Sequence, residues 1–92
     1  MPDGNNIPGH IVISATGRDA GHAYVALGWY KPQTLLVADG RGRTVSNPKK
    51  KNVKHIKQLD TIANKVTDAL VNGLTITDED IRQDLAHIEA TR

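Results

Sequence analysis

The stretch GHIVISATGRDAGH, residues 9–22, begins with a β-branched run and continues into a loop in which two glycines enclose a charged pair. The run at residues 10–14 ends before Gly17, which predicts a strand followed by a turn. Residues 23–29 then alternate between two faces, which predicts a second strand. The chain is therefore expected to begin with two strands joined by a glycine-containing loop.

Short segments separated by turns continue the β pattern beyond this pair. Lys31-Pro32-Gln33 predicts a turn, residues 34–38 a third strand, and Asp39-Gly40 a hairpin. We expect a fourth strand at residues 43–46 and a fifth within residues 53–59, with loops near residues 40–43 and 47–52. Several short strands at such intervals favour a small barrel, because closing the sheet removes its vulnerable edges.

The apolar period becomes helical beyond Leu59. Apolar side chains there follow a spacing of three and four, as in Leu59, Ile62, Val66, Ala69 and Leu70. Gly73 is well placed to end this first helix. Thr77 and the three acidic residues after it predict the N-cap and first turn of a second helix.

The length of 92 residues indicates one small domain with an appendage. We expect a disordered start at residues 1–6, a barrel at residues 7–59, and a helical extension packed on it at residues 60–92. The chain has no cysteine, and its four histidines lack ligand spacing, so no metal or other cofactor is expected. Neither a membrane span nor a secretion signal is evident, which predicts a cytoplasmic monomer.

Charge is unevenly distributed along the chain although the formal net charge is +2. Residues 1–59 carry nine Lys and Arg against three Asp, whereas residues 60–92 carry three against seven acidic residues. Such a split indicates one face for a polyanion and another that stays solvated. The alternative is that surface charges are uneven without functional meaning.

Enzymatic function finds little support in the sequence. The loop at residues 17–22 lacks the GK[ST] signature of a phosphate loop and joins two strands, so it offers no helix N-terminus to an anion. Ser14, Asp19 and His22 form only a nominal triad. The acidic residues after Thr77 are explained by helix capping. We therefore predict no catalytic residues and no enzyme.

Three basic loops supply cations for a polyanion. Arg18 lies at the tip of the first loop, Arg41 and Arg43 follow a turn, and lysines follow Pro48. Arginine makes forked contacts with phosphate, whereas lysine acts as a mobile point charge. The candidate RNA-binding residues are Arg18, Arg41, Arg43, Lys49, Lys50, Lys51, Lys54, Tyr24 and Tyr30.

The two tyrosines are included because of their place in the second strand. Its alternation puts Val25, Leu27 and Trp29 on the core face and Tyr24 and Tyr30 on the opposite face. The tyrosines could therefore stack on an unpaired base. The alternative is that they cover the barrel or contact a helix. Trp29 is expected in the core rather than in a ligand platform.

Residues 9–14 followed by residues 17–22 resemble the KOW motif, which consists of a strand, a loop with a glycine, and the start of the next strand. The continuation through residues 36–40, Arg43 and residues 48–56 is similar to small bacterial KOW-domain RNA-binding proteins. These are related to the KOW-bearing large-subunit ribosomal proteins of the fourteen-e type. The resemblance covers the predicted strands in order, up to the start of the helical part.

The resemblance implies a mainly β fold with C-terminal α, in which an SH3-like barrel of about five strands precedes two short helices. It also implies binding to RNA, ribosomal RNA above all, and a role at the ribosome or in its assembly, with ribosomal proteins as further partners. By position, Gly17 and Gly21 shape the first loop, Arg18 presents charge from it, and the other basic loops form a second edge.

Two residues depart from the KOW pattern. Ala20 stands where many KOW loops have a lysine, and Gly42 loosens the loop between Arg41 and Arg43. KOW domains also bind proteins, so fold alone does not fix function. The alternative function is a protein-interaction module that docks a ribosomal or transcription partner.

Overall fold

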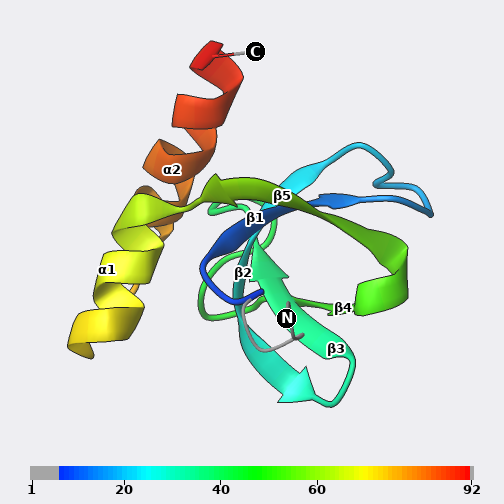
Figure 1. Ribbon diagram of the computed structural model, residues 1–92, viewed down its shortest axis with the longest axis horizontal. Coiled ribbons are helices and arrows are strands. Elements are labelled where there is room, and N and C mark those ends of the chain that lie inside the picture. Colours follow the sequence, from blue (N-terminus) through cyan, green and yellow to red (C-terminus); the bar gives the residue numbers. More distant parts are fainter. Residues whose placement is uncertain (1–6, 92) are drawn as a thin grey trace.

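The fold is a five-stranded antiparallel sheet followed by two C-terminal helices, and the computed structural model describes residues 7–91 (Figure 1). The expected disorder at residues 1–6 lies outside the described residues. The elements are β1 (His10–Ser14), β2 (Ala23–Lys31), β3 (Thr34–Ala38), β4 (Lys49–Asn52), the 3₁₀ turn η2 (Val53–His55), β5 (Ile56–Ile62), α1 (Asn64–Asn72) and α2 (Asp78–Thr91). The predicted sheet and helices are thus confirmed.

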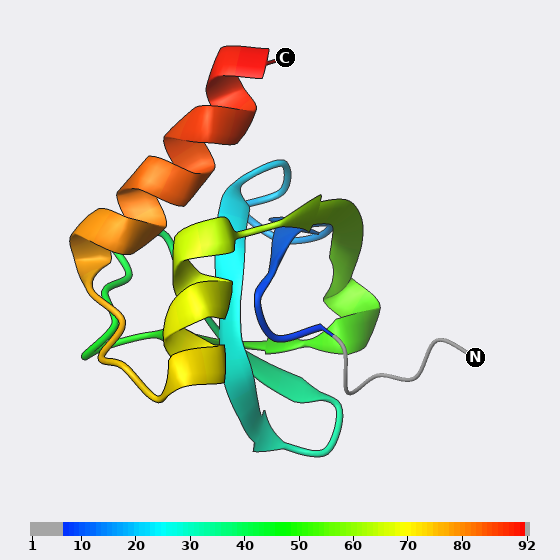
Figure 2. The same ribbon diagram turned by 60° about the vertical axis from the view of Figure 1, so that its left-hand side comes forward.

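The strands lie in the order β4-β3-β2-β1-β5, so β4 and β5 form the two edges of the sheet. Only the three residues of η2 separate these edge strands in the chain. The backbone amide of Val53 donates to Gln33 (2.9 Å), and that of Ala15 donates to His55 (2.8 Å). Both helices lie on one side of the sheet, and η2 lies on the other (Figures 1 and 2).

The predicted position of the fourth strand is wrong. The strand is the lysine run itself, β4, which pairs with β3. Within residues 43–46, only Thr44 takes part in β pairing, through an isolated bridge to Asn47. The side chain of Val45 packs against the helix side of the sheet, and its amide donates to the Asp78 carboxylate (2.8 Å). Docking on α2 therefore replaces strand pairing in this segment.

The fifth strand and the first helix also begin later than expected. Residues 53–55 form η2 because the Asn52 side chain accepts from the Lys54 amide (3.0 Å) and caps the turn. Leu59 and Ile62, expected in the helix, belong to β5, where Ile62 pairs with His10. The sheet partner therefore overrides the helical spacing in this segment.

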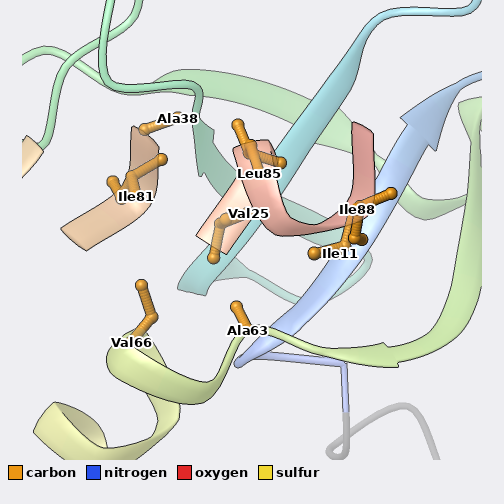
Figure 3. Packing of buried hydrophobic residues seen from close by; sticks show 8 residues of the cluster. All are labelled: Ile11, Val25, Ala38, Ala63, Val66, Ile81, Leu85 and Ile88. Atoms are coloured by element: carbon orange, nitrogen blue, oxygen red, sulfur yellow. The ribbon is translucent and has the colours of Figure 1, made fainter. Parts of the chain in front are cut away.

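Both faces of the sheet are buried. On the helix side, the sheet and the two helices meet in one apolar cluster (Figure 3), which consists of Ile11, Val25, Ala38, Ala63, Val66, Ile81, Leu85 and Ile88. The cluster on the other face consists of Val12, Tyr24, Ala26, Leu35 and Val37. Fully burying a Val, Leu or Ile side chain contributes about 1.5–3 kcal/mol, so both clusters stabilise the fold.

This double burial corrects the assignment of faces in β2. The pairing of β2 with β3 shifts between Ala26 and Gly28, which leaves Leu27 as an extra residue and reverses the alternation. Trp29 is consequently half-buried against the cluster that contains Tyr24, rather than the one that contains Val25. The expectation that Tyr24 lies outside the core is wrong, since its exposed fraction is 3%.

The helix ends follow the predicted signals. Gly73 adopts the left-handed conformation (φ 68°) and ends α1. Thr77 accepts from the Asp80 amide (3.1 Å), and Asp80 accepts from the Thr77 amide (3.3 Å), which forms a capping box at the start of α2. Both predictions are confirmed.

α2 makes polar contacts with α1 and with the turn that follows β3. Buried Asp84 accepts from the amides of Lys65 (3.2 Å) and Val66 (3.0 Å), so α2 caps α1, whose own N-cap residue provides no side-chain bond. Arg82 donates to the carbonyl of Gly40 (2.6 Å). Gly40 has φ 77°, and a Cβ there would lie 2.6 Å from the Asp78 carbonyl oxygen, so this close approach requires glycine.

Candidate functional site

The loop between β1 and β2, residues 15–22, is the point where the basic segments of the molecule meet. Asp19 in this loop binds Lys49 (2.9 Å) and Lys51 (3.2 Å) of β4. Its carboxylate also accepts from the Tyr24 hydroxyl (2.7 Å) and the Ser14 hydroxyl (2.8 Å). Four donors from three strands therefore converge on one carboxylate.

This network shifts the pKa of both acidic groups within it. The hydrogen bonds from Lys49 and Tyr24, followed by those from Ser14 and Lys51, hold the pKa of Asp19 far below its usual range against the effect of burial. Burial, together with the neighbouring Asp19 carboxylate, raises the pKa of Tyr24. Asp19 is therefore ionised and Tyr24 neutral across the physiological range.

The loop has two further polar contacts, one with η2 and one with the end of β3. Thr16 Oγ1 lies 3.2 Å from His55 Nδ1 in η2, and His22 Nε2 lies 2.7 Å from Asp39 Oδ2. Asp39 also accepts from the amides of Arg41 and Arg43, both at 2.9 Å. Burial alone would raise the pKa of Asp39, but these hydrogen bonds outweigh it and hold the pKa below its usual value.

Four predicted cations are exposed, either on this loop or on the two segments that it contacts, η2 and the residues that follow β3. They are Arg18, Arg41, Arg43 and Lys54, and none of their side chains forms an ion pair within residues 7–91. Together with the partly neutralised Lys49 and Lys51, they define what we call the basic face. Its six cations outnumber the carboxylates of Asp19 and Asp39 by four.

The remaining predicted residues are not part of this face. Lys50 projects from β4 on the side opposite its neighbours, and its Nζ lies 4.3 Å from the centroid of the Tyr30 ring. Tyr30 is 53% exposed and is the second-last residue of β2. This end of β2 is far from the β1–β2 loop (Figures 1 and 2). Tyr24 is buried and cannot stack on a base in this structure.

Sequence reasoning missed the acidic partner of the lysines and the contribution of α2. Lys49 and Lys51 are two residues apart, and in a strand this spacing places both side chains on one face. The sequence predicts a loop near residues 47–52, and a loop does not fix the direction of either side chain. Arg82 of α2 lines a cleft of about 230 Å³ together with His22, Asp39 and Arg41. No local sequence signal predicts this role for Arg82, because only the tertiary fold brings it beside the loops.

The basic face carries an excess of positive charge, and its chemistry therefore favours binding an anion.

The part of the chain that the structure describes contains no group of three or more His, Asp or Glu side chains placed to hold a metal ion. Within residues 7–91, no helix combines the length and apolar character needed to cross a membrane. No family model and no curated protein matches the chain.

Proposed function

We propose that the protein binds RNA, ribosomal RNA above all, through phosphate contacts made by the basic face. The observation that carries this proposal is that one loop, residues 15–22, gathers cations from segments far apart in the sequence. Four of these cations are exposed and free of carboxylate partners among the described residues. Arginine and lysine on a folded surface suit the phosphate backbone, which supplies most of the electrostatic affinity.

We further propose that the sheet closes as an SH3-like barrel of the KOW type. The edge strands β4 and β5 are joined by the short turn η2, and the hydrogen bonds of η2 connect it to the β2–β3 hairpin and to the β1–β2 loop. The fixed loop would hold Arg18 in place, since Asp19 beside it is bound by four donors. The resemblance of residues 9–56 to KOW-domain proteins extends the proposal to the ribosome in the cytoplasm as the place of binding.

The salt dependence of RNA affinity tests the electrostatic part of the proposal. Log affinity for single-stranded RNA should fall with log salt at about −0.7 per phosphate neutralised, so four contacts predict a slope of about −3. Replacing Arg18 with Ala should flatten the slope by about 0.7. Lys65→Ala is the matched control, because Lys65 is an exposed lysine on α1, away from the basic face.

Fluorescence anisotropy with a labelled RNA at several salt concentrations measures both slopes. An Arg18→Ala variant with the same slope and affinity as the wild type would contradict the proposed contact. The ribosomal target is tested by crosslinking in cells followed by sequencing of the attached RNA. Discrete positions in ribosomal RNA are expected, and a scatter over unrelated transcripts would contradict that part of the proposal.

A second candidate function, docking to a protein partner, is favoured by apolar side chains at the end of α1. Val71 is 78% exposed and Leu74 is 64% exposed, next to the partly exposed Leu70. A Val71→Ser, Leu74→Ser double variant should leave RNA affinity unchanged. If the variant keeps its affinity for RNA but loses its association with ribosomes, then docking to a protein partner is the main determinant of ribosome association.

A further inference from the structure

A groove is lined by residues at and beside the β2–β3 hairpin. This hairpin lies at the end of β2 opposite the β1–β2 loop (Figures 1 and 2). The volume of the groove is about 610 Å³, within the range of about 300–1,000 Å³ that is usual for ligand pockets. We propose that this groove takes an unpaired base of the bound RNA, stacked against Tyr30. The inference rests on the proposed function and adds a recognition subsite to it.

The walls of the groove are suited to a flat, partly apolar ligand. Trp29, Tyr30 and Pro32 line it, with Ile7 and Val53 as further apolar surface. Tyr30 as a residue is 53% exposed and belongs to no buried cluster, so its ring can be contacted without rearrangement of the core. Nucleobases stack on such rings with little dependence on sequence, because every base has a π face.

The charges around the groove favour a nucleotide over an apolar peptide. Lys31 is the only charged residue among the described residues that line it, and no acidic side chain does. Lys50 adds a second cation, 4.3 Å from the centroid of the Tyr30 ring, without lining the groove itself. A ligand with an apolar, planar body and an attached negative charge complements this arrangement, and a nucleotide has both.

Two unfavourable features of the fold, a backbone residue with a positive φ and a buried donor without a partner, also lie at this groove. Gln33 has φ 67° and is the only non-glycine residue within residues 7–91 with a positive φ. The Nε1 donor of Trp29 is buried and has no hydrogen-bond partner among the described residues. Strained backbone is concentrated at functional sites in folded proteins, and a buried donor without a partner requires an explanation. The other unpaired buried nitrogen among the described residues, His10 Nδ1, does not line the groove, so it is the strained Gln33 together with Trp29 that supports a binding role.

β4 connects the groove to the basic face. Lys49 and Lys51 bind Asp19 of the β1–β2 loop, whereas Lys50, between them, lies over Tyr30. An RNA strand that contacts the exposed cations near the loop can therefore follow β4 to the groove. The phosphate next to the inserted base would then meet Lys50 or Lys31.

The single tryptophan of the chain makes the groove directly observable, because Trp29 lines it. The probe is an oligouridylate of about eight nucleotides, and the comparison probe is the same ribose-phosphate backbone without bases. The first should change the emission of Trp29, whereas the second should bind without changing it. Tyr30→Ala should weaken binding of the oligouridylate about tenfold. Tyr30→Phe, which keeps the ring, should bind it within about twofold of the wild type.

The outcomes separate this inference from the proposed function. If both probes bind equally well, Tyr30→Ala has no effect and Trp29 emission is unchanged, the groove inference is overturned while RNA binding stands. If neither probe binds at low salt, the proposed function itself fails. If a proline-rich peptide changes Trp29 emission and the oligouridylate does not, the groove is a peptide site and the inference is wrong.

Discussion

Neighbouring lysines of β4 have opposite roles, although nothing in their local sequence distinguishes them. Lys51 lies on the face of β4 that turns toward Asp19, its side chain is 11% exposed, and it forms an ion pair at 3.2 Å. Lys50 lies on the other face and is exposed, and its Nζ lies 4.3 Å from the centroid of the Tyr30 ring. The alternation of the strand assigns one lysine to the fold and the other to the solvent.

This difference changes the meaning of the lysine run. A count of charges treats its members as equivalent, but Lys49 and Lys51 are partly neutralised by one carboxylate, whereas the charge of Lys50 remains available. The contrast is open to direct experimental tests, because substitutions on the two faces of one strand should affect different properties.

The largest effect is expected at Asp19, on which the inward-facing lysines depend. Asp19→Asn removes the negative charge that compensates two cations and weakens the bonds to Tyr24 and Ser14. Hydrogen bonds to charged groups contribute about 1.5–3 kcal/mol, so the free energy of unfolding should fall by about 2–3 kcal/mol. Urea denaturation measures this change, and a variant as stable as the wild type would show that the Asp19 network is dispensable.

The stabilising effect of Asp19 should also depend on pH. Its pKa is lowered in the folded protein, so its contribution is fully present above the unfolded-state pKa of about 3.9 and is lost as pH falls below that value. The stability difference between wild type and Asp19→Asn should be constant between about pH 7 and 5 and should shrink toward pH 3. Using the difference cancels the contribution of Asp39, whose pKa is lowered as well.

Local signals in the sequence predicted much of this fold. The strands that became β1, β2 and β3 follow from β-branched or alternating runs between turns, and the helix ends follow from Gly73 and Thr77. These features depend on neighbouring residues alone. The start of α1 was predicted too early because the spacing of Leu59 and Ile62 is compatible with a helix, and only pairing with β1 makes them a strand.

The parts of the site that were missed depend on contacts between distant residues. β4 reads as a loop because it is a run of cations, and it becomes a strand only beside β3. The burial of Tyr24 follows from a sheet that is covered on both faces, whereas the alternation in the sequence predicts a core on one face only. Exposure of Arg18, Arg41 and Arg43 was predictable, since each lies in or beside a turn.

An intermediate effect on stability is expected when the two faces of β4 are compared with the same substitution. Lys51→Met keeps the length of the side chain but removes one of the charged donors to Asp19, so the free energy of unfolding should fall by about 1.5 kcal/mol. Lys50→Met should stay within about 0.5 kcal/mol of the wild type, because the exposed position has no carboxylate partner and a thioether also packs well on Tyr30. Equal losses in the two variants would remove the contrast between the faces.

The smallest effect is expected in RNA binding by the same two variants. Here Lys50→Met, and not Lys51→Met, should show the larger change. Lys50→Met removes a cation that is free to contact phosphate, so the salt slope should flatten by about 0.7 and affinity at about 0.1 M salt should fall about fivefold. Lys51→Met should flatten the slope less than Lys50→Met does, because the Asp19 carboxylate that Lys51 shares with Lys49 already neutralises part of that charge in the folded protein. Anisotropy titrations of both variants against one labelled RNA provide the measurement. A slope flattened equally in Lys51→Met and Lys50→Met would mean that RNA phosphate displaces Asp19, so that the inward-facing lysines contact RNA as fully as Lys50 does.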